Sequence, residues 1–250
     1  MPHSGKKDEA AELFCKGSCT MEYQPILELG SGKTFGFEAL LRGMNGTPVP
    51  FPEPLFSAEA QRSDGNLLRL DLSCVGSALR HGRELSRDHT LFINAYAQTL
   101  QYLSCNVSLL VQLLTELGID PRKIVFEISE KTDLAFARNV EKSLCSLVEL
   151  GVHVAIDDIG GSFNWLHHML NMKPAFLKVD KAFIYDIHLS KRKQALVRSL
   201  NLMCQAMGLQ VIAEGIEGPK QLQFLNEIGV AYAQGFWFGN PGAAGPWVKK

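Results

Sequence analysis

Oxygen-bearing side chains follow short apolar stretches at several places along the chain. Phe35-Gly36-Phe37 leads into Glu38, and Leu91-Phe92-Ile93 leads into Asn94. The same arrangement produces a set of six groups: Glu38, Asn94, Glu127, Asp157, Asp158 and Glu214. Carboxylate and amide oxygens are hard ligands that suit Mg²⁺ or Mn²⁺ better than zinc. Six such groups gathered in one place would need cations to hold them together, and two ions about 3.5–4 Å apart would form a two-metal hydrolase site.

The adjacent pair Asp157-Asp158 suits this arrangement, because one carboxylate can bridge two ions while the other binds the second. Taken alone, an Asp-Asp pair after a strand is more often explained by a turn or a helix cap. The metal-site hypothesis therefore depends on the six groups together.

A lysine and a glutamine occupy comparable positions. Lys178 lies in Phe-Leu-Lys-Val-Asp, and Gln234 follows Ala231-Tyr232-Ala233. A lysine inside an apolar strand needs a partner or a lowered pKa. Lys178 would orient an attacking water or neutralise phosphate charge; the alternative is that it extends to solvent or pairs with Asp180.

Alternating strands and helices are predicted to position these groups. Apolar runs predict strands at 21–29, 34–41, 90–94, 124–128, 153–157, 176–179, 210–214 and 232–236. Helical spacing predicts helices near 67–85, 106–117, 133–150, 182–207 and 218–228. This order indicates an α/β fold, a TIM-like (β/α)8 barrel with an irregular, partly antiparallel first hairpin. Polar groups at the ends of barrel strands gather at the C-terminal mouth, where barrel active sites lie.

Composition limits the classes of function. The chain has 250 residues, 46% of them hydrophobic, and a formal net charge of -1. That suits one domain at 20–250 after a flexible lead at 1–19, and it argues against binding of long nucleic acid. The N-terminus lacks an apolar signal core, no run approaches the ~20 apolar residues that span a bilayer, and the scattered cysteines favour reduced thiols. We expect a cytoplasmic location without membrane contact by this segment, either as a separate protein or as the cytoplasmic domain of a larger one.

Several ordered motifs resemble one known family. They are Tyr23-Gln24-Pro25-Ile26, Glu38-Ala39-Leu40-Leu41-Arg42, Phe92-Ile93-Asn94, Phe126-Glu127-Ile128-Ser129-Glu130, Asp157-Asp158, Leu177-Lys178-Val179-Asp180, Ala213-Glu214-Gly215-Ile216-Glu217 and Gln234-Gly235-Phe236-Trp237-Phe238-Gly239-Asn240-Pro241. In this order, and over about residues 20 to 245, they are similar to the EAL-domain family of cyclic di-GMP phosphodiesterases. A lone Glu-Ala-Leu would carry no weight, whereas the ordered set is specific.

The resemblance implies an activity and a role for each matching residue. The reaction would be hydrolysis of one phosphodiester of cyclic di-GMP to linear pGpG by a water activated by two Mg²⁺ or Mn²⁺ ions, in bacterial second-messenger signalling. The metal ligands would be Glu38, Asn94, Glu127, Asp157, Asp158 and Glu214, with Asp157 shared. Catalysis would involve Glu38, Lys178, Glu214 and Gln234. Substrate contacts would come from Gln24, Arg42 and Asp180, and loop support from Glu130 and Glu217. The resemblance also implies a homodimer, and it leaves open GGDEF or sensor domains in the native protein.

One loop departs from the family pattern. The stretch after the paired aspartates usually runs Phe-Gly-Thr/Ala-Gly-Tyr-Ser-Ser-Leu, whereas here it is Ile159-Gly160-Gly161-Ser162-Phe163-Asn164-Trp165-Leu166. A glycine admits positive φ that a serine adopts only at a cost, so the altered loop would weaken turnover. The alternative function is therefore a catalytically weakened cyclic di-GMP receptor or protein-interaction module.

Overall fold

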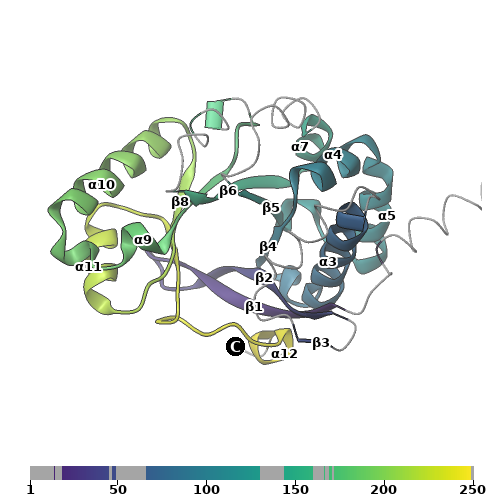
Figure 1. Ribbon diagram of the computed structural model, residues 1–250, viewed down its shortest axis with the longest axis horizontal. Helices are drawn as coiled ribbons and strands as arrows, with labels where there is room; N and C mark the ends of the chain where they lie inside the picture. Colours follow the sequence, from purple (N-terminus) through teal and green to yellow (C-terminus); the bar gives the residue numbers. More distant parts are fainter. Residues whose placement is uncertain are drawn as a thin grey trace, which may run out of the picture.

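The strands of the protein close into a barrel (Figure 1). The computed structural model describes residues 14, 19–44, 47–48, 66–129, 144–159, 166, 169–170 and 172–248. The strands are β1 (Cys19–Glu28), β2 (Thr34–Met44), β3 (Thr47–Pro48), β4 (Thr90–Asn94), β5 (Ile124–Ser129), β6 (His153–Ile159), β7 (Phe176–Val179), β8 (Gln210–Ala213) and β9 (Tyr232–Gln234). Their order is β1-β9-β8-β7-β6-β5-β4-β2, the pairing of β1 with β2 closes the ring, and β3 lies outside it beside β2. The predicted TIM-like barrel is confirmed.

Strand β1 differs in direction from the rest of the ring. It runs antiparallel to both of its neighbours, β2 and β9, while the remaining ring pairs, from β2–β4 to β8–β9, are parallel. The turn between β1 and β2 contains Gly32 at φ 68°, a left-handed conformation that costs glycine little. The partly antiparallel first hairpin is thereby confirmed.

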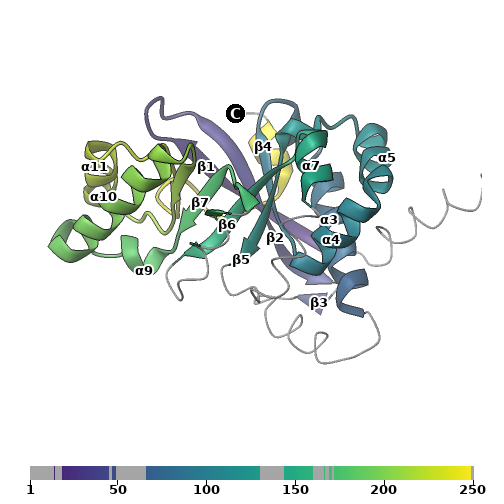
Figure 2. The same ribbon diagram turned by 90° about the horizontal axis from the view of Figure 1, so that it is seen from above.

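Helices surround the barrel in two groups (Figure 2). One side carries α3 (Asn66–Gly82), α4 (Ala97–Cys105), α5 (Val107–Leu117) and α7 (Cys145–Leu150), and the other carries α9 (Lys181–Ile184), α10 (Lys191–Ala206) and α11 (Pro219–Glu227). Short 3₁₀ turns lie at Leu85–Arg87, Pro121–Lys123 and Ile187–Leu189, and α12 (Ala244–Val248) ends the described chain. None of the helices in the described ranges combines the length and the apolar character needed to cross a membrane.

The helical prediction was wrong in part. The helix expected at 182–207 is divided, because Asp186 adopts φ 55° and Ser190 then caps α10 by accepting a hydrogen bond from the Lys193 N–H at 3.3 Å. Helix α4 was not predicted. The first part of the helix expected near 133–150 lies largely outside the described residues.

The barrel interior is apolar at the end opposite the mouth. Ile26, Phe92, Val125, Ala155, Phe176 and Ile212 form its buried cluster. Phe35 and Tyr232 pack against this cluster with ring centroids 4.3 Å apart. Phe35 reaches the interior because the register slips by one residue between Ile26 and Leu27, a β-bulge that turns its side chain inward. These apolar side chains separate the charged groups inside the ring from solvent at this end.

The N-terminal part of the described chain is attached to α3. Phe14 is buried, and its carbonyl accepts a hydrogen bond from Arg80 Nη1 at 3.0 Å. Strand β1 begins at Cys19, the last residue of the stretch predicted as a lead, and the Cys19 thiol lies 3.9 Å from that of Cys74 on α3.

Candidate active site and metal centre

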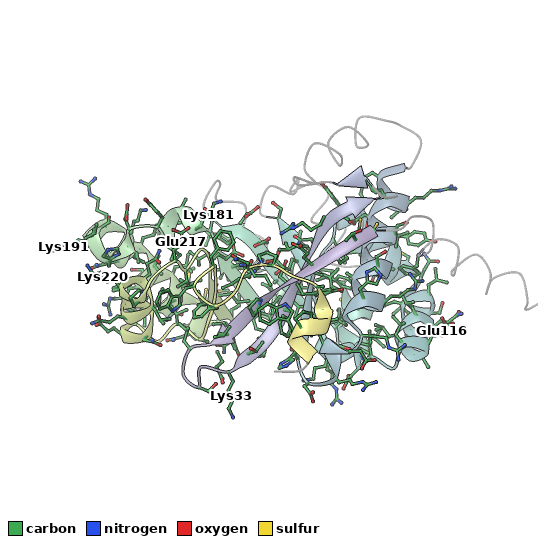
Figure 3. The ribbon with its side chains drawn as sticks, turned by 90° about the horizontal axis from the view of Figure 1, so that it is seen from below. Lys33, Glu116, Lys181, Lys191, Glu217 and Lys220 are labelled. Carbon is green, nitrogen blue, oxygen red and sulfur yellow. The ribbon has the colours of Figure 1, made fainter. Side chains whose placement is uncertain are left out.

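The carboxyl ends of the parallel strands bring the predicted chemical groups together. Asn94 and Gln234 are the last residues of β4 and β9, and Glu214 follows β8 directly. Asn94 pairs with Glu127 in the β4–β5 register, and Gln24 on β1 pairs with Glu38 on β2. The hairpin turn that carries Lys33 lies at the opposite end of these strands (Figure 3). Strand register therefore places the groups in one layer near the mouth.

Lys178 occupies the centre of this layer. Its side chain is 1% exposed, and its ammonium nitrogen forms ion pairs with carboxylates from four different segments. The Nζ distances are 2.8 Å to Glu127, 2.9 Å to Glu214, 3.2 Å to Asp157 and 3.3 Å to Glu38. A buried charge is tolerated only with such partners. The partner suggested by the sequence, Asp180, instead accepts a hydrogen bond from the Ala182 N–H at 2.7 Å and caps α9.

Amide side chains hold the Glu38 carboxylate from both sides. Asn94 Nδ2 donates to Glu38 Oε1 at 3.1 Å, and Gln234 Nε2 donates to Glu38 Oε2 at 2.7 Å. Gln234 Nε2 also donates to Gln24 Oε1 at 2.9 Å, and Gln24 Nε2 donates to the Gly239 carbonyl at 3.2 Å. This chain of hydrogen bonds fixes the orientation of the carboxylate before any ligand arrives.

The carboxylates form two groups of three that share one member. Glu38, Glu127 and Asp157 each offer an oxygen within 4.8 Å of the others, and so do Asp157, Asp158 and Glu214. Glu127 Oε2 is buried and accepts no hydrogen bond within the described part of the chain, which leaves it available to a cation. Hard oxygen donors in this arrangement suit Mg²⁺ or Mn²⁺, so the residues fit a pair of such ions. Glu214 and Asp158 belong to the same group of three, so an oxygen of the Glu214 carboxylate lies beside one of the Asp158 carboxylate.

Two other predicted residues, Arg42 and Glu217, lie around the mouth. Arg42 Nε donates to Glu22 Oε2 at 2.8 Å. The Glu217 N–H donates to Gln221 Oε1 at 2.8 Å at the start of α11. Glu130, predicted as loop support, lies outside the described residues, as does most of the variant loop, 160–165.

Sequence reasoning did not identify Asp71 of α3. Its carboxylate is buried and accepts a hydrogen bond from the N–H of Tyr96, the residue just before α4, at 2.8 Å. This contact fixes the start of α4, three residues after Asn94. Burial raises the pKa of Asp71 to about 6. A signal existed, because Asp71 falls three residues after Leu68 and four before Val75, on the apolar face of the predicted helix.

Comparison with known proteins decides the family. The EAL domain model matches residues 8–241. The chain belongs to the EAL domain family. A relative from Pseudomonas aeruginosa, the cyclic di-GMP phosphodiesterase NbdA, is 32% identical over 242 residues, which cover 94% of this chain and 30% of that protein. The blue light- and temperature-regulated antirepressor BluF of Escherichia coli is 27% identical over 218 residues, 86% of this chain and 52% of that protein.

Solved structures give the same result. The calcium and cyclic di-GMP complex of Klebsiella pneumoniae BlrP1 matches with a TM-score of 0.79 at 30% identity, covering 91% of this chain and 56% of that one. This EAL domain thus spans less than two thirds of the length of each of these three proteins.

In this EAL domain, burial raises the pKa values of the carboxyl groups at the site, and the positive charge of Lys178 lowers them. Burial, against the attraction of Lys178, raises the pKa of Asp157 to about 6 and that of Glu214 to about 8, and it raises the pKa of Glu127 well above its usual range. For Glu38, burial also acts upward, but the Lys178 charge and the hydrogen bonds from Gln234 and Asn94 outweigh it and lower the pKa. Burial would lower the pKa of Lys178, yet its carboxylate neighbours raise it well above the ordinary value.

A dependence of stability on pH follows for the metal-free EAL domain. Carboxyl groups whose pKa is raised by folding stabilise the fold while protonated, and this stability is lost as the pH rises through their folded pKa values. The melting temperature in EDTA should therefore fall between about pH 6 and pH 8, mainly as Glu214 (pKa about 8) loses its proton, because most of the contribution of Asp157 (pKa about 6) is already lost by pH 6. Mn²⁺ should reverse the trend, because it binds the deprotonated carboxylates.

Thermal unfolding at several pH values, with EDTA or with Mn²⁺, measures this effect. Glu214→Gln should flatten the upper part of the EDTA curve, because it removes the group that titrates there. A melting temperature in EDTA that rises from about pH 6 to pH 8 would contradict the assignment.

Gly235, directly after Gln234, is tightly enclosed in the EAL domain. A Cβ atom there would overlap the backbone nitrogen and oxygen of Ile216. The same groups of Ile216 donate to the Gln234 carbonyl at 3.1 Å and accept from the Trp237 N–H at 3.0 Å. We expect Gly235→Ala to destabilise the fold by roughly 1–3 kcal/mol and to displace Gln234 from Glu38. Chemical denaturation measures this cost, with Gly218→Ala as the control.

Gly218 suits that comparison because a Cβ there would meet nothing within 4 Å. Equal stability of the two variants would show that the contact with Ile216 does not restrict residue 235.

Proposed function

We propose that this chain hydrolyses one phosphodiester bond of cyclic di-GMP and releases linear pGpG. The observation that carries the proposal is the pair of carboxylate groups that share Asp157 around the buried ammonium of Lys178. Membership of the EAL domain family and the printed activity of NbdA support the choice of substrate.

The carboxylates would hold two divalent cations, Mg²⁺ or Mn²⁺. Glu38, Glu127 and Asp157 would hold one ion, and Asp157, Asp158 and Glu214 the other. When bound, such ions lower the pKa of water and stabilise charge on the attacking and leaving oxygens of an in-line displacement. Asn94 would complete the first site through its amide oxygen, since its Nδ2 donates to Glu38.

The chain's own polar groups would position the reactants. Lys178 keeps its proton at Nζ, because the surrounding carboxylates raise its pKa; it can therefore donate hydrogen bonds to an attacking water and balance charge. Gln234 would keep Glu38 in its ligating orientation through the 2.7 Å hydrogen bond. Arg42, at the mouth, would bind a phosphate of the substrate with its planar guanidinium.

The test is incubation of the purified chain with cyclic di-GMP and either Mn²⁺ or Mg²⁺, with the nucleotides separated by chromatography over time. We expect pGpG to form only with metal and not in EDTA. Unchanged substrate under all metal conditions would refute the hydrolase proposal. Calorimetric titration of the same sample in EDTA then measures binding without turnover.

A second function, binding without turnover, is favoured by one comparison. BluF, which this chain resembles over 86% of its length, is named as an antirepressor. The variant loop after Asp158 is the feature of this sequence that fits such a role. Saturable binding of cyclic di-GMP without pGpG would establish the receptor in place of the hydrolase.

A further inference from the structure

Two charged residues face each other at the barrel mouth above the carboxylate layer. Along β1, Ile26 belongs to the interior cluster and Gln24 bonds to Gln234 inside the ring. Side chains alternate along a strand, so Glu22 lies on the same inner face, one step nearer the mouth. On β2, Arg42 lies four residues beyond Glu38 toward the mouth.

A β-bulge directs Arg42 toward Glu22. Thr20 pairs with Gly43 and Met21 pairs with Leu41, so Arg42 is the unmatched residue of β2. Bulges of this kind re-aim a side chain and are frequent next to active sites. Arg42 Nε donates to Glu22 Oε2 at 2.8 Å, and Arg42 Nη1 donates to the Leu41 carbonyl at 3.1 Å. Two of the three guanidinium nitrogens therefore have partners among the residues that the structure describes.

This pair opposes the binding of an anion. A guanidinium binds phosphate best through two parallel N–H groups, and Glu22 holds the Nε–H that one such fork would use. The two side chains are 30% (Arg42) and 37% (Glu22) exposed. Ion pairs with that exposure contribute little and open readily, so a phosphate can displace the carboxylate but must compete with it.

We propose that Glu22 is an affinity-determining residue, an internal carboxylate that competes with a ligand phosphate for Arg42. The inference rests on the proposed function, because it takes Arg42 as the phosphate contact. Glu22 would thereby weaken binding of cyclic di-GMP and raise the substrate concentration needed for half-maximal turnover.

The experiment compares Glu22→Gln with the wild-type chain. Titration calorimetry with cyclic di-GMP in EDTA measures the dissociation constant, and initial rates with Mn²⁺ measure kcat and KM. We expect Glu22→Gln to bind about two- to five-fold more tightly, the range that an exposed ion pair allows. KM should fall by a similar factor with kcat unchanged, because the competition weakens binding of the substrate and of the transition state equally.

Two further variants separate competition from a general change of charge. Glu84→Gln removes the same charge from an ion pair with Arg87 (3.0 Å) at the far end of the barrel and should leave binding unchanged. Glu22→Gln in an Arg42→Ala background should produce no tightening, because the contested group is absent. The difference between the effects of Glu22→Gln in the wild-type chain and in the Arg42→Ala background gives the coupling free energy between Glu22 and Arg42.

The binding measurements can contradict the inference in two ways. Unchanged or weaker binding by Glu22→Gln would overturn the inference, and so would equal tightening in the Arg42→Ala background, which would indicate a field effect. If neither the wild-type chain nor Glu22→Gln binds cyclic di-GMP, the proposed function and this inference both fall. If both bind it without forming pGpG, the hydrolase proposal falls and the two dissociation constants still test this inference.

Discussion

Lys178→Met should destabilise the metal-free protein by about 3–5 kcal/mol, the cost of removing one partner from a buried ionic cluster. Methionine keeps the length of the side chain but leaves the four carboxylates around Nζ without their common cation. They would then have to take up protons or water, both of which oppose folding near neutral pH. Urea unfolding in EDTA measures the loss.

Metal should partly rescue this variant, because divalent ions supply the positive charge that the lysine no longer provides. The midpoint of unfolding of Lys178→Met should therefore rise more with Mn²⁺ than that of the wild-type chain. Lys33→Met, at the exposed hairpin turn (Figure 3), is the matched control and should behave as wild type. An unchanged midpoint for Lys178→Met in EDTA would show that its ammonium does not hold the carboxylates together.

Glu38→Ala should reduce hydrolysis of cyclic di-GMP by roughly 10³-fold or more, equivalent to about 4 kcal/mol in the activation barrier. The substitution removes one oxygen donor from the first carboxylate group and the acceptor for both Asn94 and Gln234. Turnover is measured as pGpG formed in Mn²⁺. The melting temperature in EDTA should fall moderately, because Asn94 and Gln234 lose their shared acceptor and Lys178 loses one of its four carboxylates; turnover is therefore compared at a temperature at which both proteins are folded.

Glu28→Ala provides the control for this experiment. Glu28 is an exposed carboxylate at the other end of the first hairpin, where it accepts a hydrogen bond from the Ser31 hydroxyl at 2.5 Å. It should retain full turnover. Wild-type activity in Glu38→Ala would remove Glu38 from the metal centre and with it the proposed arrangement of the two ions.

Local patterns in the sequence determined much of the architecture. Strands 90–94 and 176–179 were predicted with the bounds that the structure has, because an apolar run that ends in a polar residue marks a buried parallel strand and its exit. Gly118 and Gly151 adopt φ of 68° and 100° and cap α5 and α7, as is typical of glycines that directly follow a helical pattern.

Elements held by distant residues were not predictable. Helix α4 begins where Asp71, on another helix, accepts the Tyr96 N–H, and nothing within residues 97–105 specifies that partner. The inward turn of Phe35 and the unmatched position of Arg42 both depend on the register between β1 and β2. Register is a property of the strand pair, which a single strand does not encode.

The candidate site also combines features that the local sequence predicts with features that depend on contacts between distant residues. The sequence alone indicated which side chains are candidates for the proposed chemistry, because a carboxylate, an amide or a lysine at the end of an apolar strand stands out by its type. Only the tertiary structure decided that Lys178 contacts four carboxylates at once, that Glu214 lies beside Asp158, and that Arg42 pairs with Glu22. These distances arise from closure of the ring and from the hydrogen-bond register of neighbouring strands, both of which join segments far apart in the chain.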